Sequence, residues 1–316
     1  REFQARHQET LVIYACKDYI GLALASLVDQ EGLGADVVSG GELAFLAAVD
    51  FPPGKIYFHG NNKSPQELRE ALEYGVGRIV VDNFYELELL SRLAQEMGRR
   101  QPVLLRLSPG IDPHTHVKTT TGTVDSKFGF PIVTGQAAEA VGRALASPYL
   151  ELVGLHFHLG SPIFQVEPYQ EAIEVVVELA ARTPGLSLQE LGVGGGFAVR
   201  YLPEDEPPSV ATYAEAIVRT LQDACRRHHL PLPRLVVEPG RAIVARAGIA
   251  LYTVGSWKEI PGIRRYVAVD GGMGDNIRPA LYGSRYCALL ANRPLDPPTG
   301  PVTVVGKFCE SGDVLM

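Results

Sequence analysis

The chain has 316 residues, 46% of them hydrophobic, which is enough apolar material for one large domain or for one large and one small domain. A formal charge of −7, with Lys and Arg scattered along the chain, argues against nucleic acid or a membrane surface as the main partner. The four cysteines are widely spaced, which fits a reducing cytoplasm, and no apolar run reaches the roughly 18 residues of a membrane span.

Short apolar runs alternate with segments of helical periodicity over most of the chain, which is typical of strand–helix units in a parallel sheet. We count eight such runs and expect strands at residues 11–15, 35–38, 55–59, 78–82, 102–106, 152–158, 188–193 and 235–238. Helices are expected around 24–27 and at 42–49, 65–74, 85–97, 169–182 and 212–228. A polar insertion, 108–127, follows the fifth strand. Eight units predict a closed (β/α)8 barrel of the TIM type.

The helical signal disappears after Arg241. Apolar runs at 249–254, 265–269 and 302–308 are separated by Gly and Pro and are predicted to be strands, whereas the three prolines of 295–301 favour a loop. We therefore expect an α/β chain with two domains, a barrel at residues 1–245 and a β-rich domain at residues 246–316.

Catalytic groups of such barrels lie where the strands end. Lys17 directly follows the first strand, where a desolvated amine would be a nucleophile toward a carbonyl, although a lone lysine is more often a surface residue. The last strand ends in Glu238-Pro-Gly-Arg241, which places a carboxylate and a guanidinium at the barrel mouth. Taken alone, that pair also fits an ordinary surface ion pair.

Two further strand ends carry candidate ligand-binding groups. Alternation puts His156 and His158 on one face of the sixth strand, where an imidazole could stack on a flat cofactor, bind a metal, or be a satisfied core histidine. Gly194, Gly195 and Gly196 follow the seventh strand and would let backbone N–H groups approach an anion, with Ser161 as a nearby hydroxyl. A tight structural turn is the alternative for the glycines.

Together these groups predict a pyridoxal 5'-phosphate (PLP) site. Lys17 would carry the cofactor as a Schiff base, the glycines and Ser161 would hold its phosphate, and Glu238 would keep the ring nitrogen protonated. A protonated ring accepts electrons from a carbanion, so the site suits decarboxylation or racemisation at the α-carbon of an amino acid. We expect no metal.

The β-rich domain carries candidate substrate-binding groups. Arg278 offers a planar fork suited to a carboxylate, with Tyr282 as a donor beside it. Glu310 could accept from an ammonium group, and Cys309 is a candidate proton donor. Without context, the charged groups would be ordinary surface residues and the cysteine a small core residue.

These motifs, in this order, resemble the fold-type III PLP-dependent decarboxylases, which share the fold of alanine racemase, and most closely the members that act on diaminopimelate. The resemblance spans nearly the whole chain and rests on Tyr14-Ala-Cys-Lys17, residues 34–43, Asp125-Ser-Lys-Phe-Gly129, His156-Phe-His-Leu-Gly-Ser161, Gly194-Gly-Gly196, Glu238-Pro-Gly-Arg241, Arg278-Pro-Ala-Leu-Tyr282 and Cys309-Glu-Ser-Gly-Asp313. It also leads us to expect family segments beyond both ends of this sequence.

The resemblance implies a role for each candidate residue. Lys17 forms the Schiff base, His158 stacks on the pyridine ring and Glu238 pairs with the ring nitrogen. Ser161 and the amides of Gly194, Gly195 and Gly196 hold the phosphate, and Arg241 belongs to the cofactor and substrate sites. The distal carboxylate of the substrate is bound by Arg241, Arg278 and Tyr282, and the distal amine by Glu310. Cys309 reprotonates the α-carbon from the neighbouring subunit, which implies a homodimer with shared sites.

The implied reaction is the decarboxylation of meso-2,6-diaminopimelate to L-lysine in the cytoplasm, as part of lysine biosynthesis. One alternative is a related decarboxylase for ornithine, arginine or carboxynorspermidine, but Arg278 would repel a basic distal group. A second is a catalytically silent relative that regulates a true decarboxylase, which the joint presence of Lys17, Glu238 and Cys309 disfavours. A racemase would need two acid/base groups, and Cys309 is the one convincing second group.

Overall fold

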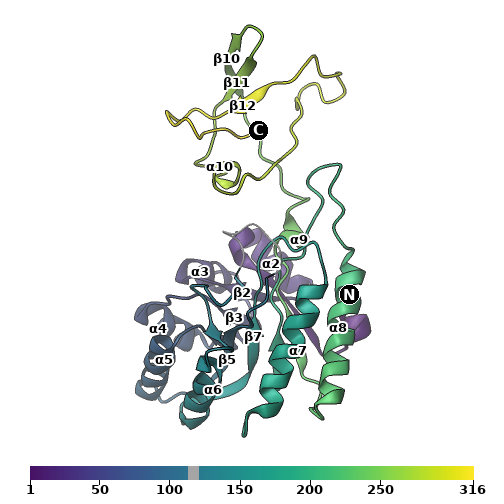
Figure 1. Ribbon diagram of the computed structural model, residues 1–316. Coiled ribbons are helices and arrows are strands. Elements are labelled where there is room, and N and C mark those ends of the chain that lie inside the picture. Colours follow the sequence, from purple (N-terminus) through teal and green to yellow (C-terminus); the bar gives the residue numbers. More distant parts are fainter. Residues whose placement is uncertain (113–120) are drawn as a thin grey trace. The chain divides into compact units, whose positions relative to one another are not determined.

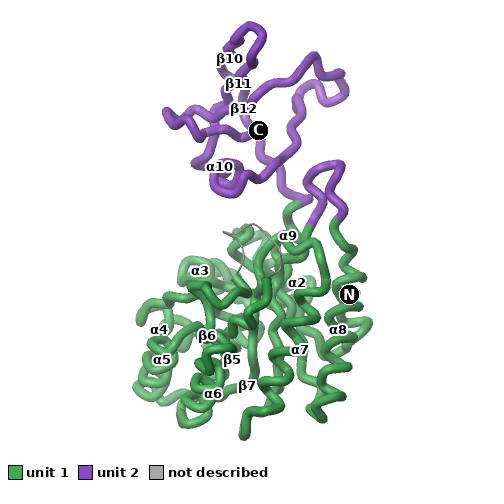
Figure 2. The backbone as a smooth tube through the Cα atoms, viewed as in Figure 1, with its two compact units in different colours: residues 1–198, 207–245 green, residues 199–206, 246–316 purple. Residues whose placement is uncertain are grey.

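The structure is a computed structural model that describes residues 1–112 and 121–316. Part of the predicted polar insertion, residues 113–120 with Val117 and Lys118, therefore lies outside the described residues. The chain forms two compact units, residues 1–198 with 207–245 and residues 199–206 with 246–316, coloured separately in Figure 2. None of the described helices has the length and apolarity needed to cross a bilayer.

The first unit is a closed parallel barrel, as predicted (Figure 1). Neighbouring strands follow the order β4-β3-β2-β1-β9-β8-β7-β5, and pairing of β4 with β5 closes the sheet. The strands are β1 Thr10–Ala15, β2 Gly34–Val37, β3 Ile56–Phe58, β4 Arg78–Val81, β5 Gln101–Ser108, β7 Leu150–Phe157, β8 Glu190–Gly192 and β9 Arg234–Val237. A short strand absent from our prediction, β6 Phe130–Pro131, pairs with the end of β5.

Helices surround the strands on the outside of the barrel (Figure 1). The helices of this unit are α1 Glu2–Arg6, α2 Leu22–Gln30, α3 Gly40–Ala47, α4 Pro65–Tyr74, α5 Phe84–Glu96, α6 Gln136–Ala146, α7 Glu167–Arg182, α8 Val210–Arg227 and α9 Arg241–Val244. Helix α4 shows why the local sequence sets the bounds: Ser64 and Glu67 form a capping box, and Gly75 ends the helix at a φ of 81°.

Helix α6 was missed from the sequence. It begins after Gly135, which has a φ of 80° and provides no side-chain cap. Its buried face is Ala137, Ala140, Val141 and Ala144, a helical spacing made almost entirely of alanine. Small side chains let α6 lie close to the sheet, but they give a weak periodic signal. The short α1 was missed as well.

The strands separate two apolar layers. Ile13, Tyr57, Val80, Leu104, Val153 and Val236 form a small buried cluster of their own, whereas their alternating neighbours pack with the helices. At the starts of the strands the carboxylate of Glu190 accepts hydrogen bonds from Tyr57 at 2.9 Å, from Arg78 at 2.7 and 3.1 Å and from Arg234 at 3.3 Å. The N-terminal end of the barrel is therefore closed by a paired, buried carboxylate.

The second unit contains a small sheet of β10 Val254–Ile260, β11 Arg264–Val269 and β12 Thr303–Val305, together with helix α10 Arg278–Tyr282. Strand β11 pairs antiparallel with β10 and parallel with β12. The predicted strand at 265–269 is confirmed, and residues 295–301 form no helix.

Two expectations for this region were wrong, and a third, the strand at 302–308, is confirmed only in part. We predicted a strand at 249–254, but the observed strand, β10, covers Val254–Ile260. A turn around Gly262, which has a φ of 71°, pairs Ile260 with Arg264 and so sets the register of the hairpin. The predicted strand 302–308 ends at Val305 because Gly306 bonds to Asp313 rather than to a strand. We also expected no helix after Arg241, but the structure contains α9 and α10 there. These helices have four and five residues, which is too short for a periodic pattern to show in the sequence.

Candidate active site

Lys17 lies immediately after β1, in the one-turn helix Cys16–Asp18. Its side chain is exposed, so the burial that we expected around the amine is not observed. Its positive charge nonetheless acts on the buried side chains at neighbouring strand ends, since it opposes the rise in the pKa of Asp36 and contributes to the low pKa of His158. Lys17 is therefore at the mouth of the barrel.

Glu238 directly follows β9 and is buried. Its Oε1 lies 2.9 Å from Nε2 of His156 and 3.5 Å from Nε2 of His59. The closer approach is within hydrogen-bonding distance, although the angle between the groups falls short of a hydrogen bond. Burial alone would raise the pKa of Glu238, but His156 and then His59 outweigh it and lower that pKa. Glu238 is thus a carboxylate anion.

His59, after β3, and Asp36, on β2, complete this cluster. Nε2 of His59 lies 3.7 Å from Oδ1 of Asp36. The rings of His59 and His156 are arranged edge to face, with their centres 4.8 Å apart. Burial lowers the pKa of His59 well below its usual value. Burial, and then the charge of Glu238, raise the pKa of Asp36 well above its usual range. His59 therefore lies between two carboxyl groups whose pKa values shift in opposite directions.

Several polar atoms of this cluster are buried and have no hydrogen-bond partner among the described residues. They are Oδ1 of Asp36, Nε2 of His59, Nδ1 and Nε2 of His156, Oε1 of Glu238 and, after β4, Oδ1 of Asp82. Buried polar atoms normally have partners, so such a group marks a place for a polar ligand. Donor atoms of His59, His156 and Glu238 lie within 4.8 Å of one another, so the set could also bind a metal ion.

His158 faces a different partner from His156. Its Nδ1 accepts a hydrogen bond from the backbone N–H of Gly195 at 3.2 Å. Burial, and then the charge of Lys17, lower the pKa of His158 well below its usual value. The ring is therefore neutral and fixed by its neighbour, which suits stacking against a flat ring.

The glycine triplet packs tightly between other strand ends. A Cβ at Gly195 would lie 2.0 Å from the carbonyl oxygen of Glu238, and one at Gly196, which has a φ of 93°, would lie 2.2 Å from that of Gly160. The Gly195 carbonyl accepts from the hydroxyl of Tyr169 at 2.6 Å. We predicted that all three amides face a phosphate, but the Gly195 amide is already used by His158.

The structure brings Ser161 and Arg241 together. Nε of Arg241, the first residue of α9, donates to Oγ of Ser161 at 3.2 Å. A hydroxyl and a guanidinium at this point form an arrangement that can bind an anion.

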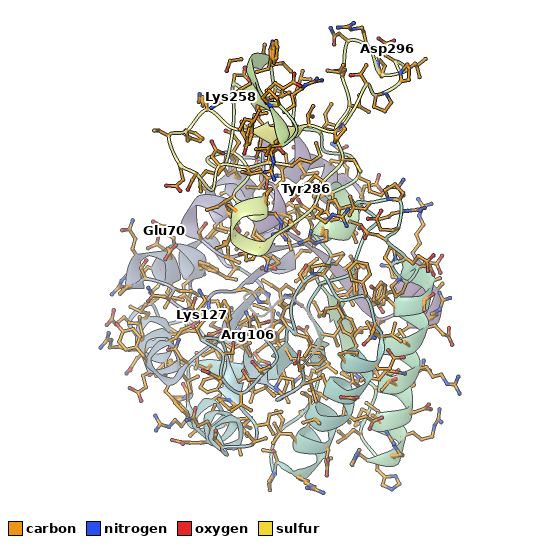
Figure 3. All side chains as sticks on the ribbon, turned by 45° about the horizontal axis from the view of Figure 1, so that its top comes forward. Glu70, Arg106, Lys127, Lys258, Tyr286 and Asp296 are labelled. Carbon is orange, nitrogen blue, oxygen red and sulfur yellow. The ribbon has the colours of Figure 1, made fainter. Side chains whose placement is uncertain are left out.

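Arg106 is a site residue that we did not predict from the sequence. It lies on β5, is buried, and is labelled in Figure 3. Its Nε lies 3.8 Å from Asp82, and its guanidinium lies 4.2 Å from the ring centre of Phe128. The available signal was a charged residue near the carboxyl end of an apolar strand, and the same signal marks Asp36 and His59.

The remaining candidates belong to the second unit. On α10 the guanidinium of Arg278 stacks 4.9 Å from the ring centre of Tyr282. Cys309 and Glu310 are exposed, on the loop that leads to the buried Asp313. That carboxylate accepts from the backbone N–H of Met273 at 2.6 Å and of Phe308 at 2.9 Å, so it ties the Cys309 loop to the loop after β11.

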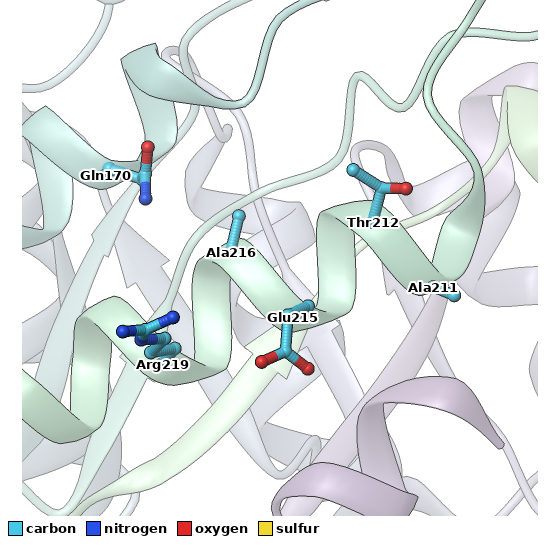
Figure 4. A pocket seen from close by; sticks show the side chains of 6 residues that line it. All are labelled: Gln170, Ala211, Thr212, Glu215, Ala216 and Arg219. Atoms are coloured by element: carbon cyan, nitrogen blue, oxygen red, sulfur yellow. The ribbon is translucent and has the colours of Figure 1, made fainter.

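A separate pocket lies on the outside of the barrel between α7 and α8. Figure 4 shows its lining side chains, which are Gln170, Ala211, Thr212, Glu215, Ala216 and Arg219. None of the candidate site residues lines this pocket.

Comparison with known proteins gives three findings. Residues 1–245 match the family model described as "Pyridoxal-dependent decarboxylase, pyridoxal binding domain". The chain is 47% identical to diaminopimelate decarboxylase of Bacillus subtilis (96% of this chain, 70% of that protein) and 48% identical to that of Actinosynnema pretiosum (100% and 70%). A crystal structure of diaminopimelate decarboxylase from Helicobacter pylori complexed with L-lysine superposes with a TM-score of 0.89 at 32% identity, covering 100% of this chain and 77% of that one.

Proposed function

This chain belongs to the pyridoxal-dependent decarboxylases, and on that basis we propose that it converts meso-2,6-diaminopimelate to L-lysine and CO2. The single observation that carries the proposal is the similarity, along nearly the whole chain, to proteins that bear the name diaminopimelate decarboxylase. The reaction would be a step of lysine biosynthesis.

The barrel mouth fits PLP, because it offers buried polar atoms that have no hydrogen-bond partner in the described part of the chain, beside an exposed amine. In the proposal Lys17 holds the aldehyde carbon, His158 lies against the ring, and Glu238 holds the ring nitrogen. Ser161 and Arg241 bind the phosphate with the amides of Gly194 and Gly196. We assign the Gly195 amide to holding His158 instead. Bound PLP supplies a ring that accepts electrons from the α-carbon.

The second unit supplies the groups for the far end of the substrate. We propose that Arg278 and Tyr282, with Arg241, bind the distal carboxylate, and that Glu310 binds the distal amine. The stacking of Arg278 on Tyr282 supports this, because it restricts the guanidinium before any substrate binds. A carboxylate bound by a guanidinium fork distinguishes diaminopimelate from ornithine and arginine.

Cys309 is proposed to hold the proton that replaces the lost carboxyl group, at a site shared between two subunits of a homodimer. Two observations support this. Cys309 and Glu310 are exposed, and the second unit exposes large apolar side chains, Ile249, Leu251, Trp257 and Ile263, that a second subunit could cover. Residues 1–245 would then bind the cofactor, and residues 246–316 would bind substrate and the partner.

We also propose a cytoplasmic location. All four cysteines are free, which suits a reducing compartment. Cell fractionation with an antibody against the chain would test this.

The test of the function is a CO2-release assay. PLP-loaded protein is incubated separately with meso-diaminopimelate, ornithine, arginine and carboxynorspermidine. Only the first is expected to release CO2, with lysine as the second product. Release from a dibasic substrate alone would overturn the substrate assignment, and no release from any of them would favour a silent regulatory relative.

A further inference from the structure

Two imidazoles from different strands converge on one oxygen of Glu238. His156 belongs to β7 and His59 follows β3, yet their Nε2 atoms lie 2.9 and 3.5 Å from the same Oε1. All three side chains are buried, with 1%, 5% and 7% of His156, His59 and Glu238 exposed. The catalytic roles proposed above use Glu238 but neither of these histidines.

A buried carboxylate anion is strongly unfavourable unless nearby groups stabilise it. Charged and titratable groups reach this region from several elements: Lys17 after β1, Asp36 on β2, His59 after β3, Arg106 on β5, and His156 and His158 at the end of β7. Asp36 opposes the charge of Glu238, and Arg106 lies 3.8 Å from Asp82. The charge of Arg106 also acts on Glu238, and the imidazoles of His156 and His59 approach its Oε1 to 2.9 and 3.5 Å.

We propose that His59 and His156 are positioning residues that hold Glu238 as an oriented carboxylate anion, so that it binds the protonated ring nitrogen of PLP. His156 acts at the shorter distance. His59 lies between Oδ1 of Asp36 and Oε1 of Glu238, at 3.7 and 3.5 Å, so its N–H can turn to either carboxyl group. This inference rests on the proposed PLP site but not on the identity of the substrate.

The primary test measures the PLP dissociation constant of cofactor-free protein by titration of PLP absorbance. His59→Phe and His156→Phe remove the nitrogen atoms and should each weaken PLP binding by about 10- to 100-fold, the range for losing a partner of a buried charge. His59→Gln and His156→Gln keep an N–H near the same place and should stay within about threefold of the wild type. The Gln variants remain informative if the Phe variants fail to fold.

A double-mutant cycle separates action through Glu238 from general damage to the barrel. In a Glu238→Gln background the anion is gone, so His156→Phe should change PLP binding by less than about twofold. The matched control is Tyr57→Phe, which removes a buried hydroxyl that donates to Glu190 at the other end of the strands. It should lower the melting temperature and leave PLP binding unchanged.

Three results would overturn the inference. One is a loss of PLP binding on His156→Phe that is equally large in the wild-type and Glu238→Gln backgrounds. Another is a Gln variant as weak as the Phe variant. The third is stoichiometric zinc in the purified wild type that His59→Phe removes, since the three side chains would then be metal ligands. Wild-type protein that binds PLP but releases no CO2 would refute the proposed substrate and leave this inference intact.

Discussion

Arg241 donates through Nε to the hydroxyl oxygen of Ser161 at 3.2 Å, which joins the loop after β7 to the start of α9. Because this pair is proposed to bind the phosphate of PLP, Ser161→Ala should weaken PLP binding by about 1 kcal/mol, or about fivefold, through loss of one hydrogen bond. PLP titration measures this. Ser187→Ala, in the loop before β8, serves as control, and an unchanged dissociation constant for Ser161→Ala would remove Ser161 from the phosphate site.

Lys17→Ala should abolish covalent attachment of the cofactor. The wild type is expected to be yellow, with an absorbance band that borohydride removes, and the variant should show neither property. Lys63→Ala is not a suitable control, because Lys63 is buried and bonded to Glu86 at 2.7 Å. Lys55→Ala, at a half-exposed position before β3, should keep the band. A yellow Lys17→Ala protein would show that another amine carries PLP.

Arg278→Ala should lower kcat/KM for meso-diaminopimelate. The loss of transition-state stabilisation should be about 2–5 kcal/mol, because a desolvated carboxylate loses its partner. Arg285→Ala is a matched control, since Arg285 is an exposed arginine of the same unit, paired with Glu204. It should leave kcat/KM within about twofold of the wild type. An intact kcat/KM for Arg278→Ala would show that the guanidinium does not select the substrate.

Mixing Lys17→Ala with Cys309→Ala subunits tests the shared site. If Cys309 serves the partner's PLP, each heterodimer contains one intact centre, and activity should return to about a quarter of the wild-type value in an equimolar random mixture. Each variant alone provides the baseline. No recovery after verified subunit exchange would mean that each chain completes its own site.

Buried thiols should make the protein sensitive to alkali. Burial raises the pKa of Cys225 from 9.0 to about 11, so the folded state favours the protonated thiol. Its stabilising contribution is complete below pH 9 and is lost as the pH rises from about 9 to about 11. Cys225→Ala should therefore show a smaller fall in melting temperature across this range. If the melting temperatures of the variant and the wild type fell equally with pH, the raised pKa of Cys225 would be contradicted.

The barrel could be predicted from the sequence because its strands are buried on both faces, which leaves continuous apolar runs such as the one ending at Val237. The register of the β10 hairpin could not, since it depends on the pairing of Trp257 with Val267 rather than on local composition. Helix α6 was not predicted because its buried positions are mostly alanine, which differ too little in hydrophobicity from the exposed positions to give a clear helical period.

For the site, residues at strand ends were predictable once the barrel was assumed, and Ser161 and Arg241 do meet. The sequence could not show that His156 rather than His158 approaches Glu238, because alternation puts both on one face. His59 and Asp36 were missed because each is a single polar residue in an apolar run, and only the closed sheet brings them together. That Lys17 is exposed while Glu238 is buried also depends on packing.

Tyr57, Arg78 and Arg234 hold the carboxylate of Glu190 at the end of the barrel where the strands begin. This pairing affects which parts of the scaffold tolerate substitution. Glu190 joins three strands at one rim, and the proposed catalytic groups lie at the other, so the two rims can be altered separately. Residues around the reacting groups can be exchanged during evolution, or by an engineer seeking new substrates, while the opposite rim keeps the cylinder closed.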